Sequence, residues 1–232
     1  MVVKKNRRIK KSTKRNLFIL FNSIIVISTL VITIIDIIHG TNGGQNNLVV
    51  QGWDYFMPFT VKINILMAVA SAIALVKLFR CKKNIRKKLY SQRFTDFYFV
   101  STVSLNLVAA TVLLFLAPVQ FINGENGLSM FSGDMLFFHL INPILAVCSL
   151  AYLFDGVKIS KVAKFFCYVP TIIYSTIYGI HVVVLHDWID FYNFTFDGNY
   201  FWTTVFAVAC GIAIYAISTF FAKTYNKRIL AH

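Results

Sequence analysis

The sequence has few charged residues and very few acidic ones. Charged residues make up 14% of the chain, whereas they make up about a quarter of a soluble globular domain. Only 9 of the 232 residues are acidic and 23 are Lys or Arg, which gives a formal net charge of +14, while 57% of the residues are hydrophobic. This composition argues against a soluble globular domain and requires an explanation for the excess of basic residues.

Paired cysteines are also lacking. Cys81 lies in a basic stretch, whereas Cys148, Cys167 and Cys210 lie within apolar runs, and the sequence contains no CxxC pair. This pattern argues against disulfides and against a zinc site. We therefore predict no zinc site, and we also expect no other metal and no cofactor.

Long apolar runs dominate the sequence instead. Six runs cover approximately residues 17–38, 59–79, 97–117, 134–154, 165–185 and 200–222, and about 20 apolar residues suffice for a helix to cross the hydrocarbon core of a bilayer. We expect Pro118 to end the third run. The pattern predicts an all-α integral membrane protein, a six-transmembrane-helix bundle over residues 17–222, between a basic tail at 1–16 and a second tail at 223–232.

The connections between these runs alternate in charge. Of the 23 Lys and Arg residues, 21 lie in the two tails and in the second and fourth connections, and the exceptions are Lys62 and Lys77 within the second run. Because cytoplasmic loops carry the excess of Lys and Arg, we predict that both termini are cytoplasmic. The abundance of Ile, Asn, Lys, Phe and Tyr indicates an AT-rich genome and so favours a bacterial cell membrane. Topology thus accounts for the basic residues, and we predict no nucleic-acid partner.

Several polar residues nevertheless lie inside the apolar runs, where an ionisable side chain costs about 2.5–3.5 kcal/mol. They are Asp36, Thr60, Lys62, Asn64, Asn106, His139, Asn142, Tyr174, Tyr178 and His181. Given the predicted topology, we expect most of them to meet in one layer in the outer half of the membrane. Pro143 follows His139 by four residues, so we expect a bend there that turns the histidine toward the bundle interior.

A hydroxyl and an imidazole at similar depth suggest nucleophilic chemistry. A hydroxyl becomes an effective nucleophile when a base removes its proton, and histidine is the usual base near neutral pH. Thr60 and His139 are the candidate pair, and Asp36 is expected either to orient the imidazole or to neutralise Lys62. Donors to a developing oxyanion would be Asn64, Asn142 and Tyr178.

Structural explanations for the same residues remain open. Thr60 could cap a helix, His139 could be a hydrogen-bonded packing residue, and Lys62 could extend to the outer interface. The stripe formed by Thr171, Tyr174, Tyr178 and His181 could join helices rather than contact a substrate. Belt anchors at the membrane interface are expected at Trp53, Tyr55, Trp188 and Tyr192.

Three segments resemble the six-span family of androgen-induced and androgen-dependent TFPI-regulating proteins and their bacterial relatives. The first is Tyr55-Phe56 with Phe59-Thr60 and Asn64; the second is His139-x-x-x-Pro143 followed by Asp155. The third comprises Pro170, Tyr174 and Tyr178, then Trp188, Tyr192 and Phe194. The sequence departs from the family pattern at Met57-Pro58 and at Lys62-Ile63.

The resemblance implies an integral-membrane threonine hydrolase with Thr60 as nucleophile and His139 as base. Its substrate would be a lipid ester, such as a fatty acid ester of a hydroxy fatty acid, that enters from the bilayer. Two alternatives remain: a small-solute, proton or ion transporter that uses Asp36, Lys62, His139 and His181, and haem binding by His139 and His181.

Overall fold

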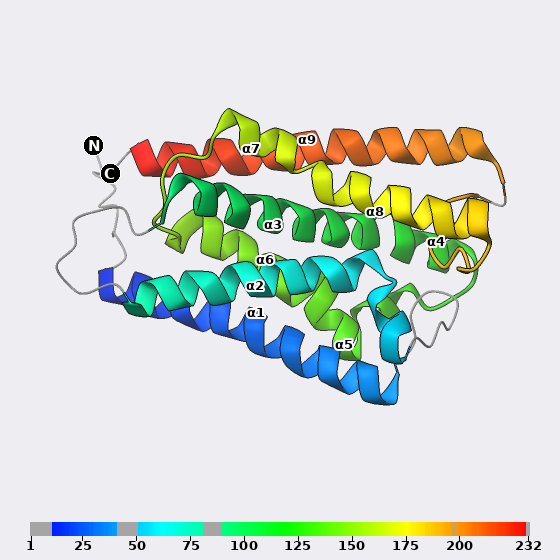
Figure 1. Cartoon of the computed structure of the whole chain (residues 1–232), viewed down its shortest axis with the longest axis horizontal. Helices are drawn as coiled ribbons and strands as arrows, with labels where there is room; N and C mark the ends of the chain where they lie inside the picture. The colour runs from blue at the N-terminus through cyan, green and yellow to red at the C-terminus, as the bar shows by residue number, and fades with distance from the viewer. Residues whose placement is uncertain (1–10, 41–50, 81–89, 197, 231–232) are drawn as a thin grey trace, which may run out of the picture.

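The computed structural model describes residues 11–40, 51–80, 90–196 and 198–230, and within these ranges it contains helices and no strand. Six helical spans are long and apolar enough to cross a membrane: residues 12–39, 59–80, 92–122, 133–153, 161–185 and 200–230. The all-α, six-span prediction is therefore confirmed at this level. The spans run side by side, and the start of the first and the end of the last lie at the same end of the bundle (Figure 1).

Three of the spans are single helices, and the other three are each composed of several consecutive helical segments. The first is α1 (Lys11–His39), the second is α2 (Phe59–Arg80) and the sixth is α9 (Tyr200–Leu230). The third joins α3 (Gln92–Thr111), the π-helical η3 (Val112–Leu116) and α4 (Ala117–Ile122); the fourth joins α5 (Gly133–Leu136), η5 (Phe137–Ile141), α6 (Asn142–Cys148) and η6 (Ser149–Leu153). The fifth joins α7 (Lys161–Phe166), α8 (Val169–Gly179) and η7 (Ile180–Leu185), and two short 3₁₀ turns, η2 (Gly52–Phe56) and η4 (Gly127–Phe131), lie in connections.

The prediction that Pro118 ends the third span is wrong. The helix widens into the π turn η3, in which the Ala117 amide bonds the Val112 carbonyl, and Pro118 then stands near the start of α4. A proline within a continuous helix leaves a carbonyl of the preceding turn without its N–H partner, and the wider π turn directly before Pro118 is where the helix accommodates this. Pro143 is accommodated in the same way, since it follows the π turn η5 and stands in the first turn of α6.

Buried polar side chains join three of the spans. The Tyr98 hydroxyl donates to Asn22 Oδ1 at 2.9 Å and lies 3.1 Å from the Ser149 hydroxyl, which also accepts from Asn22 Nδ2 at 2.8 Å. These three residues bring together α1, α3 and η6, and all three are fully buried. Helices in lipid gain no hydrophobic driving force against one another, so such hydrogen bonds help to hold them together.

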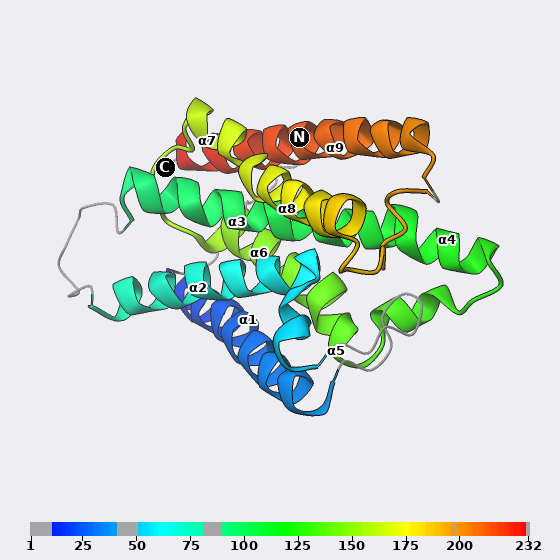
Figure 2. The same cartoon turned by 45° about the vertical axis from the view of Figure 1, so that its right-hand side comes forward.

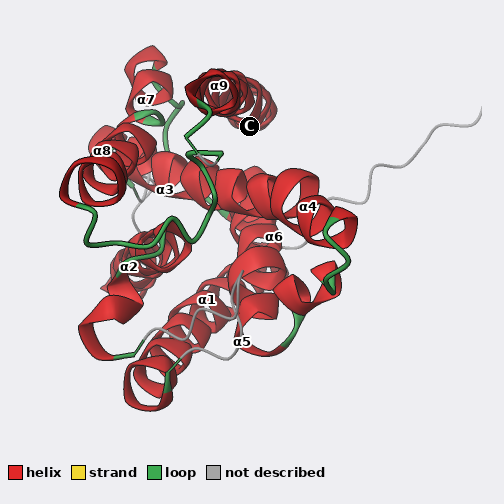
Figure 3. Ribbon diagram, turned by 90° about the vertical axis from the view of Figure 1, so that its right-hand side faces the viewer, coloured by secondary structure: helices red, strands yellow, loops and turns green. Residues whose placement is uncertain are grey.

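The bundle is packed unevenly around α3, which lies between α1, α2 and α6 on one side and α8 and α9 on the other (Figures 2 and 3). Within the most apolar stretch of the third span, 61% of the residues are buried, whereas the corresponding value for the fifth span is 11%. The fifth span therefore lies at the periphery and leaves room for a cavity on its inner side.

At the end of the bundle where α9 finishes, the helix extends further than predicted. Residues 223–230, expected to be a tail, are helical, because the connection at residues 154–160 packs on them. Tyr225 accepts a hydrogen bond from the Gly156 amide at 3.0 Å, and Asn226 Oδ1 accepts one from the Ile159 amide at 2.8 Å. The basic residues 4–10 of the predicted N-terminal tail and those at 82–88 lie outside the described ranges.

Candidate functional site

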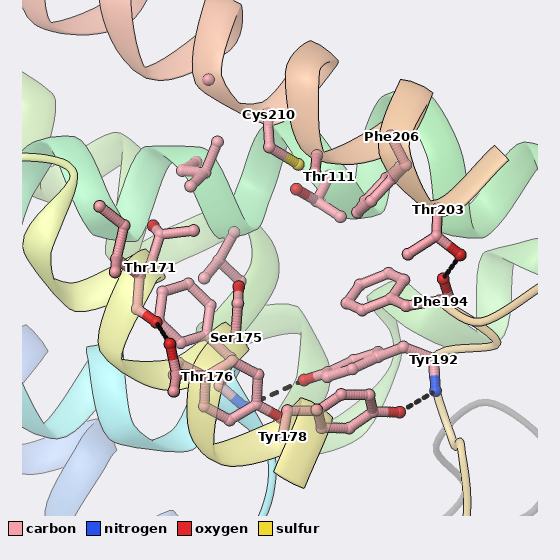
Figure 4. Close-up of a pocket in the computed structure, with 18 of the residues that line it drawn as sticks. Thr111, Thr171, Ser175, Thr176, Tyr178, Tyr192, Phe194, Thr203, Phe206 and Cys210 are labelled. Carbon is pink, nitrogen blue, oxygen red and sulfur yellow. Dashed lines mark hydrogen bonds between the residues drawn. The ribbon is translucent and has the colours of Figure 1, made fainter. Parts of the chain in front are cut away.

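A cavity of about 430 Å³ lies between α3, α8 and α9, a size within the ~300–1,000 Å³ range of ligand pockets. Thr111 comes from α3, Ser175 and Tyr178 from α8, Cys210 from α9, and Tyr192 from the connection before α9 (Figure 4). Ser175 and Ala207 both line the cavity and are both exposed. The cavity is therefore open to the side of the bundle, between α8 and α9.

The two ends of the cavity differ. One end is closed by the Tyr168 hydroxyl, which donates to the Gly211 carbonyl of α9 at 3.3 Å. The other end, beneath the connection that precedes α9, contains Phe59, Thr60 and several phenols. The lining is mostly apolar, and we call the end that holds Thr60 and the phenols of Tyr174, Tyr178 and Tyr192 the polar end of the cavity.

Thr60 lies at this polar end, 8% exposed, with its hydroxyl close to that of Tyr192. The Tyr192 oxygen accepts a hydrogen bond from the Phe59 amide at 3.1 Å. Burial raises the pKa of Tyr192, and hydrogen bonding to Thr60 and to the Phe59 amide opposes this only in part. The phenol is thus a protonated donor beside the threonine hydroxyl, a role that the prediction of an interfacial anchor missed.

The connection above the cavity is held in place by Asp190. Its carboxylate accepts hydrogen bonds from the Tyr178 hydroxyl at 2.6 Å, from the Phe194 amide at 2.9 Å and from the Thr195 amide and hydroxyl at 2.8 and 2.6 Å. Burial alone would raise the pKa of Asp190, but these hydrogen bonds outweigh it and lower the pKa below its ordinary value. Because the Tyr178 hydroxyl already donates a hydrogen bond to Asp190, Tyr178 is not the free oxyanion donor that the sequence suggested.

His139 is buried, 5% exposed, and its Nδ1 lies 2.8 Å from the Met130 carbonyl oxygen. A carbonyl only accepts, so in the neutral ring Nδ1 carries the proton and Nε2 presents a lone pair. This is the tautomer that a general base requires. The bend expected at Pro143 takes the form of the π turn η5, and the histidine belongs to that turn.

Thr60 and His139 belong to neighbouring segments but are not joined. Asn64, one turn after Thr60, donates to the carbonyl of Phe138, the residue before His139, at 3.3 Å. Within the described ranges, however, no hydrogen bond links the Thr60 and His139 side chains, and His139 does not line the cavity that Thr60 lines.

The two asparagines predicted as oxyanion donors instead join helices. Asn64 Nδ2 donates to the Thr60 and Phe138 carbonyls, at 2.9 and 3.3 Å, and its Oδ1 accepts from Asn142 Nδ2 at 3.0 Å. Asn142 Nδ2 also lies 3.4 Å from the Thr29 hydroxyl. Both amide groups have used their two protons, so neither can donate to a substrate without breaking one of these hydrogen bonds.

Asp36 lies away from both of its expected partners. Its side chain faces those of Asp134 and Tyr55 at the end of α1, and Tyr55 approaches the Thr33 hydroxyl at 3.4 Å. Among the described residues, Asp36 has neither a hydrogen bond to His139 nor an ion pair with Lys62. Tyr55 is 0% exposed, so it is a core residue rather than the interfacial anchor predicted.

The remaining ionisable groups form a third cluster. Lys62 Nζ donates to the Met57 carbonyl at 2.8 Å and lies over the rings of Tyr174 and Trp188. His181 Nδ1 lies 2.9 Å from Asp187 Oδ1, and its ring stacks on Trp188 at 4.2 Å between centroids. The predicted single polar layer is therefore divided among three places, and His139 and His181 have separate partners.

Within the described residues, no group of three or more His, Cys, Asp or Glu side chains could hold a metal ion. Comparison with family models, with curated proteins and with solved structures finds no match for this chain.

Proposed function

We propose that the protein is an intramembrane hydrolase that cleaves a lipid ester, such as a fatty acid ester of a hydroxy fatty acid. In this proposal the six spans cross a bacterial cell membrane with both termini cytoplasmic, so that the polar end of the cavity lies in the outer half of the bilayer. The observation that carries the proposal is the cavity itself: its walls are largely apolar, it opens between two helices, and the Thr60 hydroxyl lies at its polar end.

The acyl chain of the substrate would lie between α8 and α9, and the ester group would lie beside Thr60. Entry from the bilayer requires no passage through water, because Ser175 and Ala207 mark an opening on the side of the bundle. The closed end at Tyr168 and Gly211 would limit how far the chain extends. A pocket closed at one end suits a bound lipid better than a path for a transported solute.

The chemistry would proceed by acyl transfer. Thr60 Oγ1 attacks the ester carbonyl, His139 Nε2 takes the hydroxyl proton, and the Tyr192 hydroxyl donates to the oxyanion that develops. The alcohol leaves with the proton from His139, and a water molecule then hydrolyses the acyl-threonine to release the acid. Met130 would hold the imidazole in the required tautomer, as a carboxylate does in other hydrolases.

Thr60 and His139 must approach each other for this reaction. Catalytic hydrogen bonds are often long or poorly aligned without substrate and tighten when it binds. We propose that the ester displaces the Thr60 hydroxyl from Tyr192, which frees the phenol to bind the carbonyl oxygen and releases the threonine toward His139.

A fluorophosphonate probe tests the nucleophile. The purified protein should be labelled, Thr60→Ala and Thr60→Val should not be labelled, and Thr60→Ser should restore labelling because it keeps a hydroxyl. Tyr192→Phe should lower kcat by about 10²–10³ if its hydroxyl is an oxyanion donor. Undiminished labelling of folded Thr60→Val would exclude Thr60 as the nucleophile.

Gly211 offers a test of where the acyl chain lies. A Cβ added there would meet nothing within 4 Å, and Gly211 lines the cavity. Gly211→Phe should therefore fill the closed end, lowering kcat/KM for long-chain esters by tenfold or more while sparing esters of short acids. Gly211→Ala is the matched control and should leave the chain-length preference unchanged; equal loss for short and long esters in Gly211→Phe would contradict this placement.

A further inference from the structure

Lys62 lies on a different side of α2 from Thr60. Thr60 faces the cavity, whereas Lys62 shares its helix face with Val69, Ile73 and Val76, at spacings of 7, 11 and 14 residues. These three apolar residues are 47%, 37% and 46% exposed. The lysine thus stands at one end of an apolar strip on the outside of the bundle.

The ammonium group of Lys62 is held in a defined position. It lies 5.0 Å from the centroid of the Tyr174 ring and 5.8 Å from that of Trp188, and it donates to the Met57 carbonyl at 2.8 Å. Trp188 is in turn stacked on His181. The two aromatic rings beside the ammonium favour a cation at this position. They hold the Lys62 side chain more firmly than that of a lysine that only extends toward water.

No described carboxylate neutralises this ammonium. The ion pairs within the described ranges are those of Lys14 with Asp155 and of His181 with Asp187, and neither includes Lys62. An ammonium has three N–H donors, and Met57 uses one of them. Lys62 therefore offers a positive charge and two free donors beside an apolar strip.

We propose that Lys62, Tyr174 and Trp188 form a binding site for an anionic membrane phospholipid on the outside of α2, beside the cavity that Tyr174 also lines. The phosphodiester of the lipid accepts hydrogen bonds from the Lys62 ammonium. One acyl chain lies along Val69, Ile73 and Val76. The charge selects an anionic over a zwitterionic head group, and the apolar strip selects a lipid over a soluble phosphate. The site does not depend on the proposed hydrolysis, since it lies on the face of α2 opposite Thr60.

Quenching of Trp188 fluorescence measures occupancy of this site. The protein carries Trp53→Phe and Trp202→Phe, so that Trp188 is its only tryptophan, and it is placed in phosphatidylcholine nanodiscs. Phosphatidylglycerol with brominated acyl chains should quench at about fivefold lower mole fraction than brominated phosphatidylcholine, a factor expected for one basic residue at an anionic membrane surface. Lys62→Gln should abolish this preference, and Lys62→Arg should retain it.

Lys77→Gln is the matched control. Lys77 lies in the same helix and also stands over an aromatic ring, that of Phe94 at 4.6 Å, but near the other end of α2. Its loss removes the same charge and should leave the quenching of Trp188 unchanged. Equal quenching by the two lipids, or an unchanged preference in Lys62→Gln, would overturn the proposal, as would full displacement of the brominated lipid by soluble glycerol phosphate.

Discussion

Replacing Asn64 by Leu should loosen the contact between α2 and the fourth span. The substitution removes two interhelical hydrogen bonds, those of Asn64 with the Phe138 carbonyl at 3.3 Å and with Asn142 at 3.0 Å. Side-chain hydrogen bonds between membrane helices are worth about 0.6 kcal/mol on average and about 1.7 at most. The free energy of unfolding should therefore fall by about 1 to 3 kcal/mol. We expect a value in the upper part of this range, because one Asn142 proton is left buried without a partner.

Reversible unfolding in mixed micelles, followed by circular dichroism, measures this loss. Asn106→Leu is the control, because the one interhelical bond of Asn106, to the Pro143 carbonyl, is long at 3.5 Å, and its removal should cost less than Asn64→Leu. Asn64→Leu combined with Asn142→Leu should cost less than the sum of the two single changes, since no amide is then left unpaired. The reasoning fails if the free energy of unfolding of Asn64→Leu lies within about 0.5 kcal/mol of the wild-type value, or if the effects of the two single changes on it are additive.

Two further changes test how the ends of the bundle are held. Gly156→Ala should destabilise the fold by about 1–3 kcal/mol, because its Cβ would lie 2.5 Å from the Thr95 hydroxyl oxygen and 2.8 Å from that of Tyr225; thermal unfolding measures it, and an unchanged Tm would show that the connection yields freely. Asp190 has a lowered pKa in the folded protein, so its contribution is present above its unfolded pKa of about 3.9 and is lost as the pH falls through the lower folded value. Hydrogen exchange of the Phe194 and Thr195 amides should accordingly stay slow from pH 7 to 5 in the wild type and become faster in Asp190→Asn at pH 7, whereas fast exchange already at pH 5 in the wild type would contradict the sign of this shift.

The spans could be predicted from the sequence because lipid imposes one simple requirement, a sufficiently long apolar helix. Their ends could not be predicted as well, because polar contacts rather than hydropathy set them. The last helix continues to Leu230, past the apolar run, where Asn226 and Tyr225 bind the connection at 154–160. Pro118 fails to end its span because a π turn precedes it.

The candidate site was predicted in part. Thr60, Tyr174 and Tyr178 do line one cavity, but the partners of the polar residues could not be predicted. A π turn adds a residue to the helix and so shifts every later residue to another face, by about 100°. His181 lies in such a turn, which follows α8, so a constant helical spacing does not give its direction relative to Tyr174 and Tyr178. The contact of Tyr192 with Thr60 was not predicted, because Tyr192 lies in a connection, where periodicity says nothing about the direction of a side chain.

The two sides of the bundle are held together by different means, and this difference suits a protein that admits lipid. Around α1, α3 and the fourth span, buried hydrogen bonds such as those of Asn22, Tyr98 and Ser149 link the helices directly. Between α8 and α9 the cavity occupies the middle. Two hydrogen bonds to α9 lie at the two ends of the cavity: the hydroxyl of Tyr168, the residue before α8, donates to the Gly211 carbonyl, and the Thr203 hydroxyl donates to the Phe194 carbonyl of the preceding connection at 2.9 Å. In the proposed function an acyl chain would therefore enter between α8 and α9 by displacing apolar side chains, while the hydrogen bonds that position α2, and with it Thr60, would remain intact.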